Sequence, residues 1–354
     1  MSRFFSKNYA SLVPYTPGEQ PQNRKYLKLN TNESPFPPSP LAQKLAREAA
    51  GEAELYSDPE VKALREAFAQ KYPVSEDEVV FVNGSDEILN FCMMAFCDDE
   101  HTLAYPDITY SFYDVVADLN HIPVQKIPLR ENFTVNVEDY IGIRKNIFIA
   151  NPNAPTGIAL PKSEIERIVA SNPDNIVVVD EAYVDFGAES SLDLIHKYDN
   201  VIVCQTFSKS RSLAGARLGF GAGNKELIKD INTIRFSTNP YNINRMTMWA
   251  GIGALTDTDY FKENCAKIQA TRAWTAKELK ELGFVMTESK ANFLFAKHPS
   301  IGGQELYLTL KEKGVLVRHF ETPLLKDYNR ITIGSDEQME EFIETIKEIL
   351  EEKK

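Results

Sequence analysis

The sequence has few of the side chains that most often bind metals or form covalent cross-links. Its 354 residues include four cysteines and five histidines. No cysteines form a C-x-x-C pair, and the nearest two, Cys92 and Cys97, lie in an apolar stretch. We therefore expect buried free thiols and no metal site. The sequence also lacks G-x-S-x-G, H-E-x-x-H and P-loop motifs, so nothing in it indicates the hydrolases and nucleotide-binding proteins that carry them.

Positive charge and long apolar runs are scarce as well. Lys and Arg number 39 against 51 Asp and Glu, which gives a formal net charge of −12. Such a balance argues against nucleic acid as a partner, because neutralising phosphates needs clustered basic residues. An anionic ligand would need a local basic pocket. The N-terminal region has no apolar run long enough for a signal peptide or a membrane span, so we expect a cytoplasmic protein.

What is present is enough apolar sequence for a large core, since 43% of the residues are hydrophobic. Between about residues 41 and 260, strand-like and helical segments alternate, which predicts crossover units and a mainly parallel sheet. The predicted strands are 79–82, 102–105, 147–150, 176–179, 201–204 and 218–220. The predicted helices include 61–71, 86–96, 163–170 and 225–234. The fold class is therefore α/β.

The two ends of the chain differ from this central part. Pro14, Pro17 and Gly18 break any regular element near the start, so residues 1–30 are predicted to form an arm. Beyond residue 260, a long helix ending at Gly283 is followed by strand-like pieces at 292–295, 315–318 and 330–333, and then by an amphipathic helix. We expect a large domain at 31–260 and a smaller α+β domain at 261–354.

A lysine motif predicts the chemistry. Lys209 follows Ser208, Arg217 stands eight residues further on, and an apolar strand ending in Asp180, with Tyr183 just after it, precedes them. These groups suit pyridoxal 5'-phosphate. Its aldehyde forms a Schiff base with a lysine, its ring nitrogen pairs with a carboxylate and its ring oxygen with a phenol. A hydroxyl and a guanidinium would hold its phosphate.

Other segments add to this site. The run from Asn83 to Glu87 joins a strand to a helix, so the amides of Ser85 and Asp86 form an anion site at the helix start; Ser85 would otherwise be an ordinary N-cap. Tyr110, in a loop after a strand, is placed to stack on the pyridine ring. The glycines at 219, 221 and 223 lack the spacing of a dinucleotide motif.

Two arginines flank the last predicted strands. Arg330 lies in an alternating run, which aims its side chain at one face, and Arg318 lies at the end of the preceding strand. A guanidinium fork binds carboxylate or phosphate well. We expect both to bind the anionic end of a substrate, with an exposed ion pair as the simpler alternative.

Taken together, these motifs resemble those of fold-type-I, pyridoxal-phosphate-dependent aminotransferases, and within them the histidinol-phosphate aminotransferase family. The resemblance covers nearly the whole chain and includes the segments 14–18, 29–35, 83–87, 151–157, 180–183, 206–217 and 330–334. It implies a homodimer with shared active sites. It also implies that Tyr56 reaches the cofactor phosphate of the other subunit and that Tyr15 of the arm meets the far end of the substrate.

One position departs from the family pattern. Ala154 stands immediately before Pro-Thr-Gly, where the family commonly has an asparagine that donates to the cofactor ring oxygen. We expect that Tyr183 alone serves this oxygen, or that Asn153 or a water molecule substitutes.

The resemblance implies transamination of histidinol phosphate with 2-oxoglutarate, a step of histidine biosynthesis, by a ping-pong mechanism through Lys209. Aromatic amino acids are an alternative donor, because a guanidinium suits a carboxylate as well as a phosphate. A decarboxylase acting on a threonine phosphate is a second alternative on the same scaffold. A regulator that binds the cofactor without turnover would normally carry a DNA-binding module, and none is evident.

Overall fold

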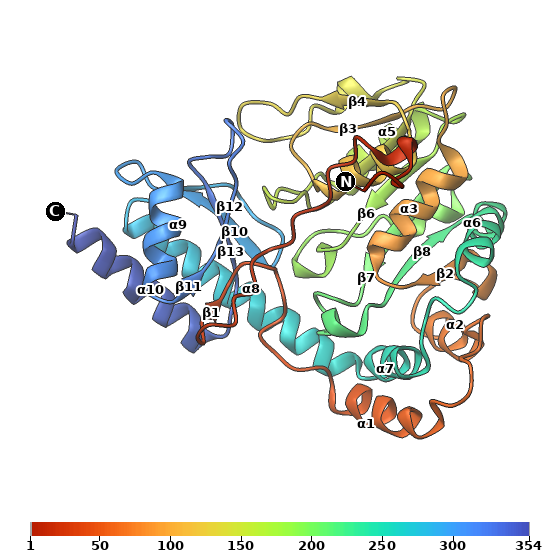
Figure 1. Cartoon of the computed structure of the whole chain (residues 1–354), viewed down its shortest axis with the longest axis horizontal. Helices are drawn as coiled ribbons and strands as arrows, with labels where there is room; N and C mark the ends of the chain where they lie inside the picture. Colours follow the sequence, from red (N-terminus) through yellow and green to blue (C-terminus); the bar gives the residue numbers. More distant parts are fainter. Residues whose placement is uncertain (1, 354) are drawn as a thin grey trace.

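The computed structural model describes residues 2–353. Its large domain is built on a seven-stranded sheet with the order β2-β8-β7-β6-β5-β3-β4 (Figure 1). Only β8 runs antiparallel to its neighbours, so the prediction of a mainly parallel α/β sheet is confirmed. The strands are β2 (Val79–Val82), β3 (Leu103–Pro106), β4 (Val124–Ile127), β5 (Asn146–Ala150), β6 (Val177–Asp180), β7 (Val201–Thr206) and β8 (Gly219–Gly223). The sequence prediction missed β4, whose central residues Gln125 and Lys126 are exposed.

Helices cover both faces of this sheet because side chains of each strand alternate between them. One face packs against α2 (Lys62–Ala69), α5 (Lys162–Ser171) and α7 (Arg245–Thr256), with α1 (Pro40–Ala49) beyond. The other face packs against α3 (Ser85–Phe96), α4 (Phe112–Leu119) and α6 (Lys225–Thr238). Of these, the sequence prediction lacked α1, α4 and α7.

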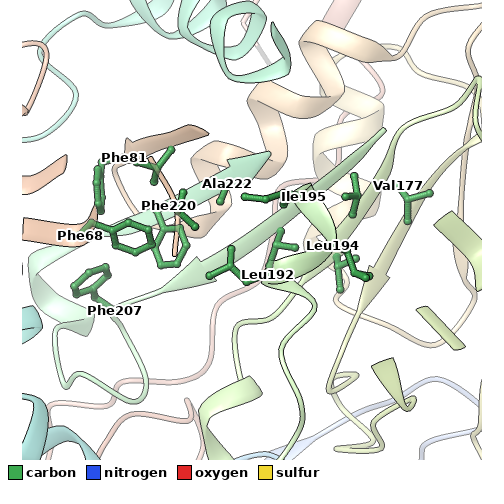
Figure 2. Packing of buried hydrophobic residues seen from close by; sticks show 14 of the residues in the cluster. Phe68, Phe81, Val177, Leu192, Leu194, Ile195, Phe207, Phe220 and Ala222 are labelled. Atoms are coloured by element: carbon green, nitrogen blue, oxygen red, sulfur yellow. The ribbon is translucent and has the colours of Figure 1, made fainter. Parts of the chain in front are cut away.

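An aromatic cluster stabilises the part of the sheet that carries the lysine motif. Figure 2 shows Phe68, Phe81, Phe207 and Phe220 close together, and the ring centroids of Phe68 and Phe220 are 4.6 Å apart. Phe207 is 1% exposed and directly follows β7. Its burial fixes the start of the loop that bears Lys209.

The small domain has a four-stranded sheet with the order β12-β13-β10-β9. Its elements are α8 (Thr258–Glu281), β9 (Val285–Met286), β10 (Phe293–Lys297), α9 (Gly303–Glu312), β11 (Val315–Leu316), β12 (Arg318–His319), β13 (Asn329–Thr332) and α10 (Asp336–Glu351). Gly283 follows α8 with a φ of +93°, as its predicted role as a cap requires. The domain boundary proposed at residue 260 lies inside α8, and the strand predicted over 315–318 is two strands.

The N-terminal segment connects the two domains, as the red trace in Figure 1 shows. The Tyr9 ring stacks on His121 of the large domain. Further along, β1 (Leu27–Lys28) pairs in parallel with β11 of the small domain. The residues between them cross the carboxyl ends of the central strands, where open α/β sheets bind ligands. None of the described helices combines the length and apolarity needed to cross a membrane.

Candidate active site

A cavity of about 470 Å³ lies between the two domains. The strands β6 and β7 end at this cavity, and the turn at Ala214–Ala216, which precedes β8, borders it. The arm and β13 complete the cavity wall. Eleven of the predicted site residues line it: Tyr15, Ser85, Asp86, Tyr110, Asp180, Tyr183, Ser208, Lys209, Arg217, Arg318 and Arg330. Residues up to 315 positions apart in the sequence thus meet in one place.

Lys209 faces this cavity from the loop after β7. Its Nζ donates to the carbonyl oxygen of Thr31 at 3.1 Å. Burial and, to a smaller extent, the positive charge of Arg330 together lower the pKa of Lys209 to about 8. At pH 7 about a tenth of this amine is unprotonated, against fewer than about one in a thousand for an ordinary lysine. A partly buried amine of this kind is suited to attack a carbonyl carbon.

Asp180 is the last residue of β6 and is 4% exposed. Burial raises the pKa of Asp180, hydrogen bonds from Tyr113 and from the backbone of Ala182 oppose this rise, and the net pKa is about 6. The Tyr113 hydroxyl donates to Oδ2 at 2.7 Å and the Ala182 N–H donates to Oδ1 at 3.2 Å. The two donors favour the charged form against the cost of burial.

Tyr113 is a site residue that the sequence analysis missed. It lies three residues after Tyr110, and the two rings meet edge to face with centroids 5.7 Å apart. Tyr110 precedes α4, whereas Tyr113 lies in the first turn of that helix. The sequence analysis named no helix over this segment, so nothing in it singled out Tyr113.

The turn before α3 and Arg217 form a cup whose free N–H groups suit an anion. Gly84 has a φ of +80°, and a Cβ there would lie 2.4 Å from Arg217 Nη2. Arg217 donates to Ser208 Oγ at 3.3 Å and to Asp86 Oδ2 at 3.2 Å. The helix begins at Ser85, and its N-cap is Gly84, so the alternative of Ser85 as the capping residue is wrong.

The side chain of Asp86 has a different role from its backbone. Its carboxylate accepts hydrogen bonds from Tyr110 at 2.9 Å and from Arg217. It therefore orients an aromatic ring and a guanidinium. Its N–H, at the start of the twelve-residue helix α3, is one of the free donors that bind an anion.

The arginines and the arm define the other end of the cavity. Arg330 Nη2 donates to the carbonyl oxygen of Asn30 at 3.2 Å, while its buried Nε has no partner within residues 2–353. Arg318 reaches the carbonyl oxygens of Thr16 and Pro17 at 3.4 Å. Tyr15 packs edge to face on Phe112 at 5.6 Å. This end has two cations and an unpaired guanidinium N–H, which suits an anion.

Two predicted residues lie outside this cavity. Asn153 is not brought into it, because its side chain holds the turn that follows β5. The amide donates to the carbonyl oxygen of Ile108 at 2.9 Å, and its oxygen accepts from Thr109 at 2.8 Å. Tyr56 is 81% exposed and stacks on Tyr241 with centroids 4.6 Å apart. It does not reach the site of its own chain, as expected for a residue assigned to a partner's site.

Ala154 does line the cavity, and its surroundings are apolar. It is 4% exposed and packs in a small cluster with Ala291 and Phe293, beside the Tyr183 ring. With Asn153 turned away, Tyr183 is the predicted substitute that the structure places in the cavity. Burial raises the pKa of Tyr183, which favours the neutral phenol, a hydrogen-bond donor.

Comparison with known proteins adds independent information. The sequence profile of the family "Aminotransferase class I and II" matches residues 24–346. Proteins named histidinol-phosphate aminotransferase are 50% identical in Brachyspira hyodysenteriae, over 99% of each chain, and 45% identical in Clostridium botulinum strain Okra, again over 99% of each chain.

A solved structure shares the fold. The histidinol-phosphate aminotransferase of Sinorhizobium meliloti, determined in complex with pyridoxal-5'-phosphate, superposes with a TM-score of 0.88 at 24% identity. The match covers 99% of each chain. At this level of identity the likeness supports the fold alone.

Proposed function

Because the chain belongs to the class I and II aminotransferase family, we propose that it is a pyridoxal-phosphate-dependent histidinol-phosphate aminotransferase that uses 2-oxoglutarate as the acceptor. The observation that carries the chemistry is the placement of Lys209, with its lowered pKa, in one cavity with Asp180 and Arg217. The full-length identity of 50% to a protein of that name supports the substrate.

The donor set of the cavity fits pyridoxal phosphate. The glycine turn before α3 leaves room that a Cβ would fill, and the Ser85 and Asp86 amides with Ser208 and Arg217 would hold the phosphate. Asp180 would pair with the ring nitrogen, Tyr183 with the ring oxygen, and Tyr110 would stack on the ring. When bound, this cofactor supplies an aldehyde carbon that accepts an amino group and a ring that withdraws electrons.

The side chains of the chain itself then perform the remaining tasks. The unprotonated amine of Lys209 would serve as the base that moves a proton from the substrate carbon. The negative charge of the Asp180 carboxylate would favour a protonated ring nitrogen. Arg330, with its free Nε–H, and Arg318 would bind the phosphate of histidinol phosphate or the far carboxylate of the acceptor, and Tyr15 would cover them.

A homodimer completes this proposal. Tyr56 is exposed outside the cavity of its own chain, and Leu55, Tyr241 and Met246 are exposed apolar residues in the same region. An exposed apolar patch is typical of an interface. We assign Tyr56 to the phosphate cup of the partner subunit, and the dimer to the cytoplasm.

Single amino donors distinguish the candidate substrates. The purified enzyme, loaded with pyridoxal phosphate, would be mixed with histidinol phosphate or with phenylalanine, and conversion of the bound cofactor to its amine form followed by visible absorption. We expect rapid conversion with histidinol phosphate, and conversion at least about tenfold slower with phenylalanine, since a lost charge-assisted contact costs about 1.5–3 kcal/mol. Equal or faster conversion with phenylalanine would assign the enzyme to aromatic amino acids instead.

A further inference from the structure

The turn at Thr31 and Asn32 contacts two of the side chains to which the proposed function gives roles at the ring, Lys209 and Tyr183. The carbonyl oxygen of Thr31 accepts the hydrogen bond from Lys209 Nζ at 3.1 Å. The side-chain Nδ2 of Asn32 donates to Tyr183 Oη at 2.9 Å. One short stretch of the N-terminal segment thus touches the amine and the phenol, which belong to the large domain.

Asn32 is held rigidly in this position. It is 1% exposed and has a φ of +57°, a left-handed conformation that asparagine tolerates better than most residues. Its N–H donates to Thr332 Oγ1 at 2.9 Å, and its carbonyl oxygen accepts from Asn292 Nδ2 at 3.0 Å. Both partners belong to the small domain, so this domain sets where the Asn32 side chain points.

The same contacts determine which end of the Asn32 amide faces Tyr183. The Thr332 hydroxyl already accepts the Asn32 N–H, so its own proton is available and goes to Asn32 Oδ1 at 3.0 Å. The Nδ2 group is then the end that faces the phenol. Because Tyr183 Oη accepts this bond, its proton is left for an acceptor in the cavity that Tyr183 lines.

Apolar side chains also pack against Tyr183. Phe293 meets the Tyr183 ring edge to face with centroids 5.1 Å apart, and Ala154 and Ala291 complete this apolar side. Burial raises the pKa of Tyr183, while the charge of Arg330 and the hydrogen bond from Asn32 lower it. A phenol that accepts one hydrogen bond becomes a stronger donor in the next, because linked hydrogen bonds polarise one another.

We infer that Asn32 is a positioning residue for Tyr183: its amide, held in place by Thr332 and Asn292 of the small domain, directs the phenol proton toward the ring oxygen of the cofactor and so sustains the contact that Ala154 cannot make. This inference rests on the proposed cofactor. It assigns Asn32 a role through Tyr183 and no contact with a reacting atom.

Asn32→Gly is the matching test, because glycine keeps the positive φ and removes only the amide. The readout is the pH titration of the visible absorption band of the enzyme with pyridoxal phosphate bound, which does not depend on turnover. A donor to the ring oxygen favours its anion, so a weakened donor moves the midpoint to higher pH. We expect a rise of roughly half a unit to one unit, with a fall in kcat larger than any change in KM.

Two further variants separate positioning from a structural role. Asn32→Asp also tolerates the left-handed backbone, but its carboxylate accepts the phenol proton, so it should raise the midpoint more than Asn32→Gly. Thr332→Val removes the hydroxyl that holds the Asn32 amide and should raise the midpoint by less than Asn32→Gly does. Thr332→Ser keeps the hydroxyl and should match the wild type. A lowered Tm in these variants without any change of midpoint would overturn the inference.

A double-mutant cycle with Tyr183→Phe gives the decisive comparison. Once the phenol is gone, Asn32→Gly should cause no additional change of midpoint; an equal additional change would show that Asn32 acts elsewhere and would overturn the inference. Failure of the proposed function is a separate result. Wild-type protein that stays colourless with added pyridoxal phosphate would refute the cofactor itself, before any variant is compared.

Discussion

At the scale of single residues, the site depends on charged groups that burial alone would neutralise. Asp180 carries a negative charge in the core because Tyr113 and Ala182 donate to its two oxygens. Lys209 is available as a base because burial and the nearby Arg330 lower its pKa to about 8. The sequence analysis selected Asp180, Lys209 and Arg330, but it did not select Tyr113 or Ala182, which hold Asp180 in its charged form.

Tyr113→Phe tests the tuning of Asp180. Its hydrogen bond opposes the rise that burial causes in the pKa of Asp180, whose net value is about 6, so the variant should raise that pKa further. Less of the carboxylate is then charged near pH 6.5, whereas at pH 8.5 it is charged in both proteins. We expect the Kd for pyridoxal phosphate to rise about tenfold at pH 6.5 and less at pH 8.5, since a hydrogen bond to a charged group contributes about 1.5–3 kcal/mol.

The measurement is equilibrium dialysis of pyridoxal phosphate at the two pH values. Tyr105→Phe is the control, because the Tyr105 hydroxyl donates to Asp114 at 2.7 Å, away from the cavity. An equal loss of affinity at both pH values would contradict the proposed titration of Asp180.

At the scale of elements, strand ends and helix starts place the polar groups. The strands β6 and β7 end side by side, so Asp180 and the loop after Thr206 enter the same crevice. The turn at Gly84 places the start of α3 next to the Arg217 side chain. Alternating strands and helices were predictable from periodicity, and these junctions follow from them. The sequence did not predict where α1, α4 and α7 begin, because the apolar faces of these helices pack against residues distant in sequence.

Gly84→Ala should damage the phosphate cup specifically. Its Cβ would lie 2.4 Å from Arg217 Nη2, and alanine disfavours the φ of +80°. We expect the Kd for pyridoxal phosphate to rise at least about tenfold, given about 1.5–3 kcal/mol for a charge-assisted contact, and the Kd for pyridoxal, which lacks the phosphate, to change much less.

Fluorescence titration with the two ligands provides the measurement. Gly51→Ala is the control, because a Cβ at Gly51 meets no atom within 4 Å. Equal weakening of both ligands by Gly84→Ala would mean that the turn serves the fold in general and not the phosphate.

At the scale of the whole molecule, the active site is assembled from separate parts. The large domain supplies Asp180 at the end of β6 and Lys209 in the loop after β7, the small domain supplies Arg318 and Arg330, and the arm supplies Tyr15. β1 ties the arm to the small domain through its pairing with β11. A second chain, as proposed, would supply Tyr56.

Mixed dimers test the shared site. Lys209→Ala and Tyr56→Ala chains would be unfolded together, refolded and assayed. In a mixed dimer one cavity has both defects, while the other has its own Lys209 and an intact Tyr56 from the partner. We expect activity per mixed dimer near half that of the wild type, well above the mean of the parents, because one cavity is complete.

A mixture of Lys209→Ala with Asp180→Ala is the control, since both residues belong to the same cavity of one chain and no complete site can form. Activity of the Tyr56 mixture equal to the mean of its parents would contradict a role for Tyr56 across the interface.

By itself, the sequence determined the α/β class, the strand-end position of Asp180, the loop position of Lys209 and the strand-to-helix junction before α3. These depend on local order and periodicity, which a linear chain carries. Only the tertiary structure decided which neighbours tune them. Asn32 and Tyr183 are 151 residues apart, Tyr113 and Asp180 are 67 apart, and Asn30 and Arg330 are 300 apart. A hydrogen bond needs its two atoms within about 3 Å, and packing of the two domains sets such distances.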